Sequence, residues 1–137
     1  MAYCRELTKQ QLLDWGFTKV DISGDLPVIH RFWFKNKSKT KQNIIINISL
    51  AEAKHKYTDN IYYQKISFSV DSKSISIPLS RFLYVWFIED IENGFVIDHI
   101  DNNKFNNKLE NLRKITIKEN LTKRYIDDPH NRINQYK

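Results

Sequence analysis

The stretch from Phe95 to Arg124 constrains the fold more than any other part of this 137-residue chain. It holds two strand-like runs, FVIDHI (95–100) and LRKIT (112–116), separated by a polar loop rich in asparagine. A helix start follows, because Thr116 and Glu119 have the S/T-x-x-E spacing of a capping box. Strand, loop, strand and helix in this order predict a compact ββα unit.

The remaining sequence predicts a helix, a set of antiparallel strands and a second helix. The expected elements are a helix in LTKQQLLDWGF (7–17) with Thr8 as N-cap and Gly16 as its end, strands at 28–35 and 43–50, a hairpin within 63–80 that turns at Asp71–Lys73, and a helix at 80–90 capped by Ser80. Residues 51–57 fit either a short helix or more strand. We interpret the apolar stripe Phe82, Leu83, Trp86 and Phe87 as core.

The predicted fold class is α+β, with an N-terminal helix and antiparallel β part followed by the ββα unit. A soft division falls near residues 60–75. We expect an accessory part at 1–60 that could contact a nucleic acid, a second domain at 61–125 with its ββα core at 95–124, and a loosely held tail at 126–137.

Charge and cysteine content narrow the classes of protein. The formal net charge of +6 favours a polyanionic partner, most commonly a nucleic acid, although solubility alone could account for it. The single cysteine, Cys4, excludes an intramolecular disulfide and a Cys-rich zinc cluster. No apolar run reaches the ~18 residues of a membrane span, and charged residues near the N-terminus do not fit a signal peptide. We therefore expect a cytoplasmic protein without a membrane partner.

The ββα unit carries one chemically distinctive group of side chains. Asp98 and His99 end the first predicted strand, Asn111 closes the loop, and Asn120 lies one turn into the predicted helix. If that helix packs across the hairpin, Asn120 can point at the strand end. The other loop asparagines, Asn102, Asn103, Asn106 and Asn107, are expected to form the turn itself, because Asn adopts left-handed backbone conformations and caps its own backbone.

The residues VIDHIDNNKFNNKLENLRKIT followed by KEN resemble the HNH endonuclease motif of phage and intron-associated nucleases. The resemblance covers roughly residues 60–124 and includes the spacing of 22 positions from Asp98 to Asn120. It implies a ββα-metal finger in which Asp98 and Asn120 bind one divalent cation. It also implies that His99 is the general base that activates water, and that Asn111 braces the loop and orients His99.

The chemistry of these residue types agrees with the implied roles. Phosphodiester hydrolysis needs an activated water and stabilisation of negative charge, and a neutral imidazole can accept a proton near neutral pH. One carboxylate and one amide suit Mg²⁺ that retains several waters, and Mn²⁺ should substitute. Neighbours on a regular strand point to opposite faces, so we expect a distortion near Ile100 or an approach of cation and water from different sides of the phosphate.

A basic fringe surrounds the predicted unit. Between residues 104 and 124 seven basic residues outnumber two acidic ones: Lys104, Lys108, Arg113, Lys114, Lys118, Lys123 and Arg124 against Glu110 and Glu119. A charge run is usually a solvated face, but beside a phosphate-cleaving site these residues are more plausibly DNA contacts. Arg113 and Arg124 are the strongest candidates, because a guanidinium binds phosphate in bidentate fashion. Arg81 could also line the cleft.

The sequence thus predicts a metal-dependent HNH DNA endonuclease that acts on double-stranded DNA, of phage or mobile-element origin. A monomer would nick one strand, and a homodimer could cut both. Residues 125–137 are too few for the separate DNA-reading domain that homing members carry, so specificity is expected from residues 1–60 or from a partner such as a phage protein. Two alternatives stay open: a non-catalytic DNA-binding or phage packaging accessory that retains the finger, and a non-specific defence or toxin nuclease.

Overall fold

The computed structural model describes residues 5–35, 39–54 and 61–127, with side chains to residue 122. Its elements are α1 (Lys9–Asp14), β1 (Phe17–Asp21), β2 (Val28–Phe34), β3 (Lys41–Ile46), β4 (Ile48–Ala53), β5 (Ile61–Val70), β6 (Lys73–Pro78), α2 (Leu79–Phe87), β7 (Phe95–His99), a 3-10 turn at Leu109–Asn111, β8 (Leu112–Thr116) and α3 (Ile117–Asp127). The predicted α+β class is confirmed.

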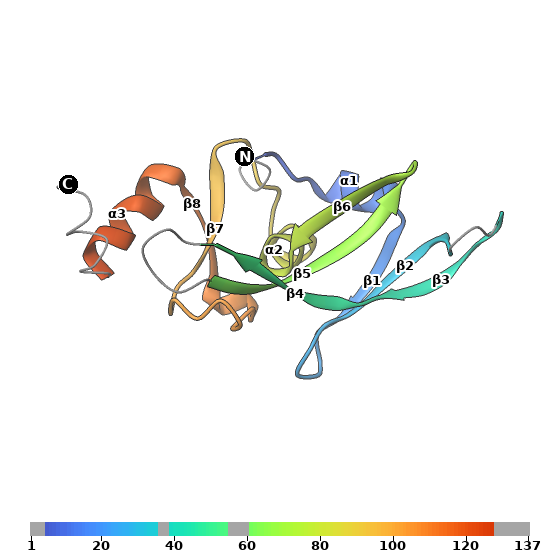
Figure 1. Ribbon diagram of the computed structural model, residues 1–137, viewed down its shortest axis with the longest axis horizontal. Coiled ribbons are helices and arrows are strands. Elements are labelled where there is room, and N and C mark those ends of the chain that lie inside the picture. The colour runs from blue at the N-terminus through green and yellow to red at the C-terminus, as the bar shows by residue number, and fades with distance from the viewer. Residues whose placement is uncertain (1–4, 36–38, 55–60, 128–137) are drawn as a thin grey trace.

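The strands form three antiparallel sheets. Their orders are β1-β2-β3, β4-β5-β6 and β7-β8. The β2–β3 hairpin extends from one end of the molecule, whereas β7, β8 and α3 lie at the other end (Figure 1). The element that lies between these ends is α2, which contacts β5, β6, β7 and β8.

The core joins β1 of the first sheet, β5 of the second sheet and α2. Phe17 on β1 lies edge-on to Phe68 on β5 and Phe82 on α2, with ring centroids 5.0 and 4.9 Å apart. Arg31 on β2 is buried beside the rings of Phe17 and Phe68. It donates hydrogen bonds to the carbonyl oxygens of Trp15 and Ser69. Burial lowers the pKa of Arg31 to about 10, so the side chain keeps its charge at neutral pH.

The expected boundary near residue 60 lies within this shared structure. The boundary between residues 60 and 61 falls between β4 and β5, and the whole of β4 pairs with the first part of β5, from Ile48↔Ile66 to Ala53↔Ile61. The two expected parts therefore share one sheet and one core. The sequence indicates a boundary there because a basic, strand-rich stretch gives way to the predicted hairpin and ββα unit. Such a change of composition does not reveal which strands pair.

Local signals predicted the helix starts unevenly. The capping box of Thr8 and Gln11 is present at α1, and Gly16 follows that helix with φ of 93°. The box of Thr116 and Glu119 is also present at α3. Ser80, however, is wrong as a cap: α2 begins at Leu79 after Pro78, and its first turn has no side-chain cap.

Other expectations were met in part. Residues 51–53 continue β4, which decides their ambiguity in favour of strand, while residues 55–57 lie outside the described part of the chain. The stripe on α2 is core at Phe82 and Leu83, but Phe87 is 39% exposed near the end of the helix. Most of the predicted tail, from residue 128 on, lies outside the described residues. None of the described helices has the length and apolar character needed to cross a membrane.

Candidate active site

The end of β7 and the loop after it form the candidate site. β7 pairs regularly with β8 up to His99↔Leu112, and the chain then turns, with φ of 65° at Asn102. The distortion expected near Ile100 thus takes the form of a strand end directly after His99. Asp98 and His99 still lie on opposite faces of the hairpin, because the pairing is regular through both residues.

Asn111 fixes the shape of the loop. Its buried side chain accepts a hydrogen bond from the backbone N–H of Asp101 and donates to the Asp101 carboxylate and to the Asn106 carbonyl oxygen, at 3.1, 2.9 and 2.9 Å. Its backbone carbonyl accepts from Ile100 at 2.9 Å. One buried amide therefore connects the end of β7 to the far side of the loop.

Asp101 is the second centre of the loop, and the sequence analysis did not identify it. Its carboxylate accepts from the backbone N–H of Asn103 and from the side chains of Asn106 and Asn111, at 2.8, 2.8 and 2.9 Å. These hydrogen bonds, that from Asn106 first, lower the pKa of Asp101 below its ordinary value. A signal for this role was present, because an Asp in a polar loop commonly accepts a hydrogen bond from the backbone N–H two residues later.

The asparagines of the loop have separate roles. The left-handed conformation expected of this group is found at Asn102, while Asn103 and Asn106 accept hydrogen bonds from backbone N–H groups two residues later. These three confirm the turn prediction. Asn107 differs, because its side chain bridges two other side chains, at 2.7 Å to Nε2 of His99 and 2.9 Å to Oε1 of Gln64 on β5.

His99 is a half-buried imidazole held by this amide. Burial lowers the pKa of His99 from its ordinary value of 6.5; the Asn107 contact opposes that shift and nearby Lys104 adds to it. The ring is therefore neutral at pH 7, as a proton acceptor must be. Oδ1 of Asn107 is a hydrogen-bond partner of the ring, whereas Asn111 acts on the loop to which His99 is attached.

Asp98 forms an ion pair on the other face. Its carboxylate is buried, and Oδ2 accepts a hydrogen bond at 2.9 Å from Nε of Arg113, the residue opposite it on β8. Asn120 lies in the first turn of α3, which contacts both β7 and β8, and its side chain is half-buried. Within residues 5–35, 39–54 and 61–122, no three His, Cys, Asp or Glu side chains gather as a metal-binding group.

The oxygen atoms of Asp98 and Asn120 suit a hard cation, and the Arg113 ion pair competes with a cation for Asp98. The carboxylate of Asp98 and the amide oxygen of Asn120 are the ligand types that Mg²⁺ accepts beside water and phosphate oxygens. Arg113 already neutralises Asp98, so a cation at this carboxylate has to share it with the guanidinium or displace the guanidinium. The Arg113 side chain is 47% exposed, which gives it room to move toward solvent.

The six predicted DNA contacts other than Arg113 and Arg81 separate into three groups. Lys104, Lys108 and Lys118 are exposed, as a phosphate contact requires. The side chains of Lys123 and Arg124 on α3 lie outside the described part. Lys114 is engaged by Glu89 and Glu92 at 2.7 and 2.9 Å, and these carboxylates raise its pKa.

Arg81 corrects one of the predictions. Its side chain is only 6% exposed and donates a hydrogen bond to the backbone carbonyl of Arg5, which connects α2 to the N-terminal segment. Arg81 lines a separate cavity with Trp15 and Tyr63, and no described residue of the loop after β7 lines that cavity. Arg81 therefore connects α2 to the N-terminal segment and does not line the cavity beside His99.

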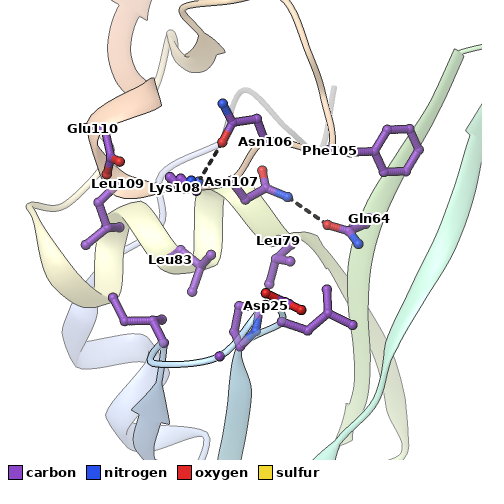
Figure 2. Close-up of a pocket in the computed structure, with 14 residues that line it drawn as sticks. Asp25, Gln64, Leu79, Leu83, Phe105, Asn106, Asn107, Lys108, Leu109 and Glu110 are labelled. Atoms are coloured by element: carbon purple, nitrogen blue, oxygen red, sulfur yellow. Dashed lines mark hydrogen bonds between the residues drawn. The ribbon is translucent and has the colours of Figure 1, made fainter.

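A cavity of about 420 Å³ adjoins the loop. Figure 2 shows residues of three elements around it, among them Gln64 of β5, Leu79 and Leu83 of α2, and Asn107 in the loop, with the hydrogen bond from Asn107 to Gln64. The turn between β1 and β2 forms the opposite wall through Asp25 and its neighbours. Asn107, whose amide contacts His99, and Gln64 of β5 thus both line this cavity.

Comparison with known proteins agrees with this geometry. Residues 86–122, which contain β7, the loop, β8 and the start of α3, match the sequence profile of the HNH endonuclease family. Over this segment the chain is similar to the HNH endonuclease family. We refer to residues 86–122 as the HNH segment.

Several relatives carry the same family name. A protein of Bacillus subtilis, named as an HNH homing endonuclease derived from the SPbeta prophage, is 33% identical over 82 residues, which are 59% of this chain and 47% of the relative. The DNA endonuclease I-HmuI of Bacillus phage SP01 is 37% identical over 59 residues, 43% of this chain and 34% of the relative. An uncharacterised HNH endonuclease of Acanthamoeba polyphaga mimivirus is 36% identical over 59 residues, 43% of this chain and 18% of the relative.

The chain therefore spans less than half of the length of each of these relatives. No solved structure matches the chain significantly.

Proposed function

We propose that this protein is a metal-dependent DNA endonuclease that hydrolyses phosphodiester bonds in double-stranded DNA. The observation that carries the proposal is the neutral, half-buried His99 at the end of β7, inside a segment that matches the HNH family. The relatives named as HNH endonucleases from a prophage, a phage and a giant virus support a phage or mobile-element origin.

His99 is the general base in this proposal. It removes a proton from water as the oxygen attacks the phosphorus, and a neutral imidazole with a lowered pKa is suited to that step at pH 7. Asn111 does not touch the reacting atoms. It acts as a positioning residue, because its amide fixes the loop that follows His99.

Asp98 and Asn120 would hold the divalent cation, so β7, β8 and α3 would form a ββα-metal finger. Bound Mg²⁺ or Mn²⁺ would supply positive charge that stabilises the pentavalent phosphate and the leaving 3′-oxygen. Without a bound cation, Arg113 forms an ion pair with the carboxylate of Asp98. When a divalent cation binds Asp98, the guanidinium of Arg113 can turn to a DNA phosphate. The ion pair is therefore compatible with the predicted role of Arg113 in DNA binding.

Two surfaces support DNA as the substrate. The first is the exposed basic group next to the HNH loop, Lys104, Lys108 and Lys118. The second is the outer face of β2 and β3, where Phe32, Phe34 and Ile45 are exposed and Lys41 lies 5.6 Å from the ring centroid of Phe34. This hairpin extends away from the HNH segment (Figure 1), so it can contact the duplex at a distance from the cut and contribute specificity.

The experiment that tests the proposal is incubation of the protein with supercoiled plasmid in Mg²⁺ or in EDTA. We expect relaxed circles with 5′-phosphate and 3′-hydroxyl ends in Mg²⁺ and intact plasmid in EDTA, since one active site cuts one strand. Linear product instead would indicate paired sites in a dimer. Metal-independent DNA binding without cleavage of plasmid or genomic phage DNA would contradict the proposal and favour the non-catalytic accessory protein.

A further inference from the structure

We infer that Gln64, a strand residue outside the HNH segment, is a positioning residue for His99 and fixes which ring nitrogen carries the proton. The inference rests on the proposed function, in which His99 is the base. It adds a residue of β5 to a site that is otherwise formed by residues 98–120.

The basis is a chain of three side chains. Gln64 Oε1 accepts a hydrogen bond from Nδ2 of Asn107 at 2.9 Å, and Oδ1 of the same Asn107 amide lies 2.7 Å from Nε2 of His99. An amide has one oxygen acceptor and one nitrogen donor group. Because Gln64 binds the nitrogen of Asn107, the oxygen is the atom turned toward the imidazole.

The direction of the hydrogen bonds from His99 through Asn107 to Gln64 determines the tautomer of His99. A carbonyl oxygen only accepts, so a neutral His99 that bonds to Oδ1 must carry its hydrogen on Nε2. Nδ1 is then the unprotonated nitrogen, and it is the atom that accepts the proton from water. If the Asn107 amide were reversed, its NH₂ group would face Nε2, and the proton would be on Nδ1.

The surroundings explain why Gln64 can hold Asn107 in one orientation. Gln64 lies in the middle of β5, paired with Leu50 of β4, so its backbone is fixed by the central sheet. Asn107 lies on a loop, and loops are held less firmly than strands. Both side chains are part-buried at the wall of the cavity in Figure 2, where the hydrogen bond between them exchanges less readily with water.

Two variants of nearly equal size separate the hydrogen bond from packing. Gln64→Leu removes the acceptor, whereas Gln64→Glu keeps an oxygen that accepts from Asn107. The first readout is the tautomer of His99 in the protein without DNA or metal, measured by long-range ¹H–¹⁵N NMR correlations at a pH where the ring is neutral. The second readout is the cleavage rate at saturating DNA, together with DNA affinity.

We expect wild type and Gln64→Glu to show protonated Nε2, and Gln64→Leu to show a mixture of both tautomers. Gln64→Leu should also cut about 10-fold to 100-fold more slowly, by analogy with the loss seen when a partner that orients a metal-binding histidine is removed. Its DNA affinity should not change, and Gln64→Glu should restore most of the rate.

An unchanged tautomer in folded Gln64→Leu would overturn the inference, whatever the protein does to DNA. So would protonated Nδ1 in wild type. A shifted tautomer in a protein that cuts no DNA would instead support the chain of hydrogen bonds and contradict only the nuclease proposal. Asn107→Leu gives a second check, since it should produce the same mixture of tautomers without altering β5.

Discussion

At the scale of single residues, two amides beside His99 have different tasks. Asn111 is buried and holds the loop, while Asn107 touches the imidazole and reaches the central sheet. Asn111 thus supports the stability of the loop, whereas the proposal gives Asn107 a part in orienting the base. The two tasks lead to separate measurements.

Asn111→Ala should lower the free energy of unfolding by about 1–3 kcal/mol, because it removes a buried amide and the three hydrogen bonds that this amide makes to Asp101 and Asn106. Thermal or chemical denaturation measures the change. Asn103→Ala is the matched control, since Asn103 is exposed and its side chain accepts from a single backbone N–H, and it should cost much less. Equal losses for the two variants would show that the loop does not depend on the buried amide.

The protonation of His99 should appear in the pH profile of cleavage. Burial lowers the pKa of His99 below 6.5, so the base is active at neutral pH and is lost as the pH falls through the lowered value. We expect a half-maximal single-turnover rate below pH 6.5 and a plateau above it. The unfolded chain takes up this proton at higher pH than the folded chain, so stability should also decline below pH 6.5. A midpoint above 6.5 would contradict the assignment.

At the scale of elements, β8 and α3 present lysines with different surroundings. Lys114 on β8 is held by two glutamates, while Lys118 on α3 is exposed. Lys118→Gln should lower the slope of log affinity against log salt by about one, as the loss of one phosphate contact does. Lys114→Gln should leave that slope unchanged and reduce stability. Identical slopes for wild type and Lys118→Gln would remove Lys118 from the DNA surface.

Local sequence signals predicted several elements but not their partners. The strands 95–99 and 112–116, the Asx turns and the Thr116 capping box depend on residues close in sequence, and all were anticipated. The pairing of β4 with β5 and the contact of Gln64 with Asn107, 43 positions apart, depend on tertiary packing that no local pattern encodes. Arg81 was misassigned for the same reason, because a basic residue on a helix gives no sign of what covers it.

Within the site, the resemblance to the family supplied more than the residue pattern did. It pointed to Asp98, His99, Asn111 and Asn120, and the structure describes their surroundings. It gave no indication that Arg113 binds Asp98 or that Asp101 collects three loop hydrogen bonds. Those contacts follow from strand register and turn geometry, which appear only once the hairpin is formed.

At the scale of the whole molecule, residues 61–127 share their core with the N-terminal part of the chain. Phe17 of β1 packs between β5 and α2, and β4 covers one edge of β5. A fragment of residues 61–127 would expose both surfaces to water. We expect it to lack a cooperative unfolding transition and dispersed NMR signals, in contrast to the full chain. A fragment that folds and cuts DNA would contradict this view of the core.

The central claim is that His99 is the base of a DNA-cleaving site, and one measurement tests it directly. The single-turnover rate of plasmid nicking in Mg²⁺ should be compared between wild type and His99→Ala, with enzyme in excess and DNA affinity measured for both. We predict a loss of roughly 10²–10⁴-fold in rate with little change in affinity. Equal rates for the two proteins would remove His99 from the reaction and contradict the proposed mechanism.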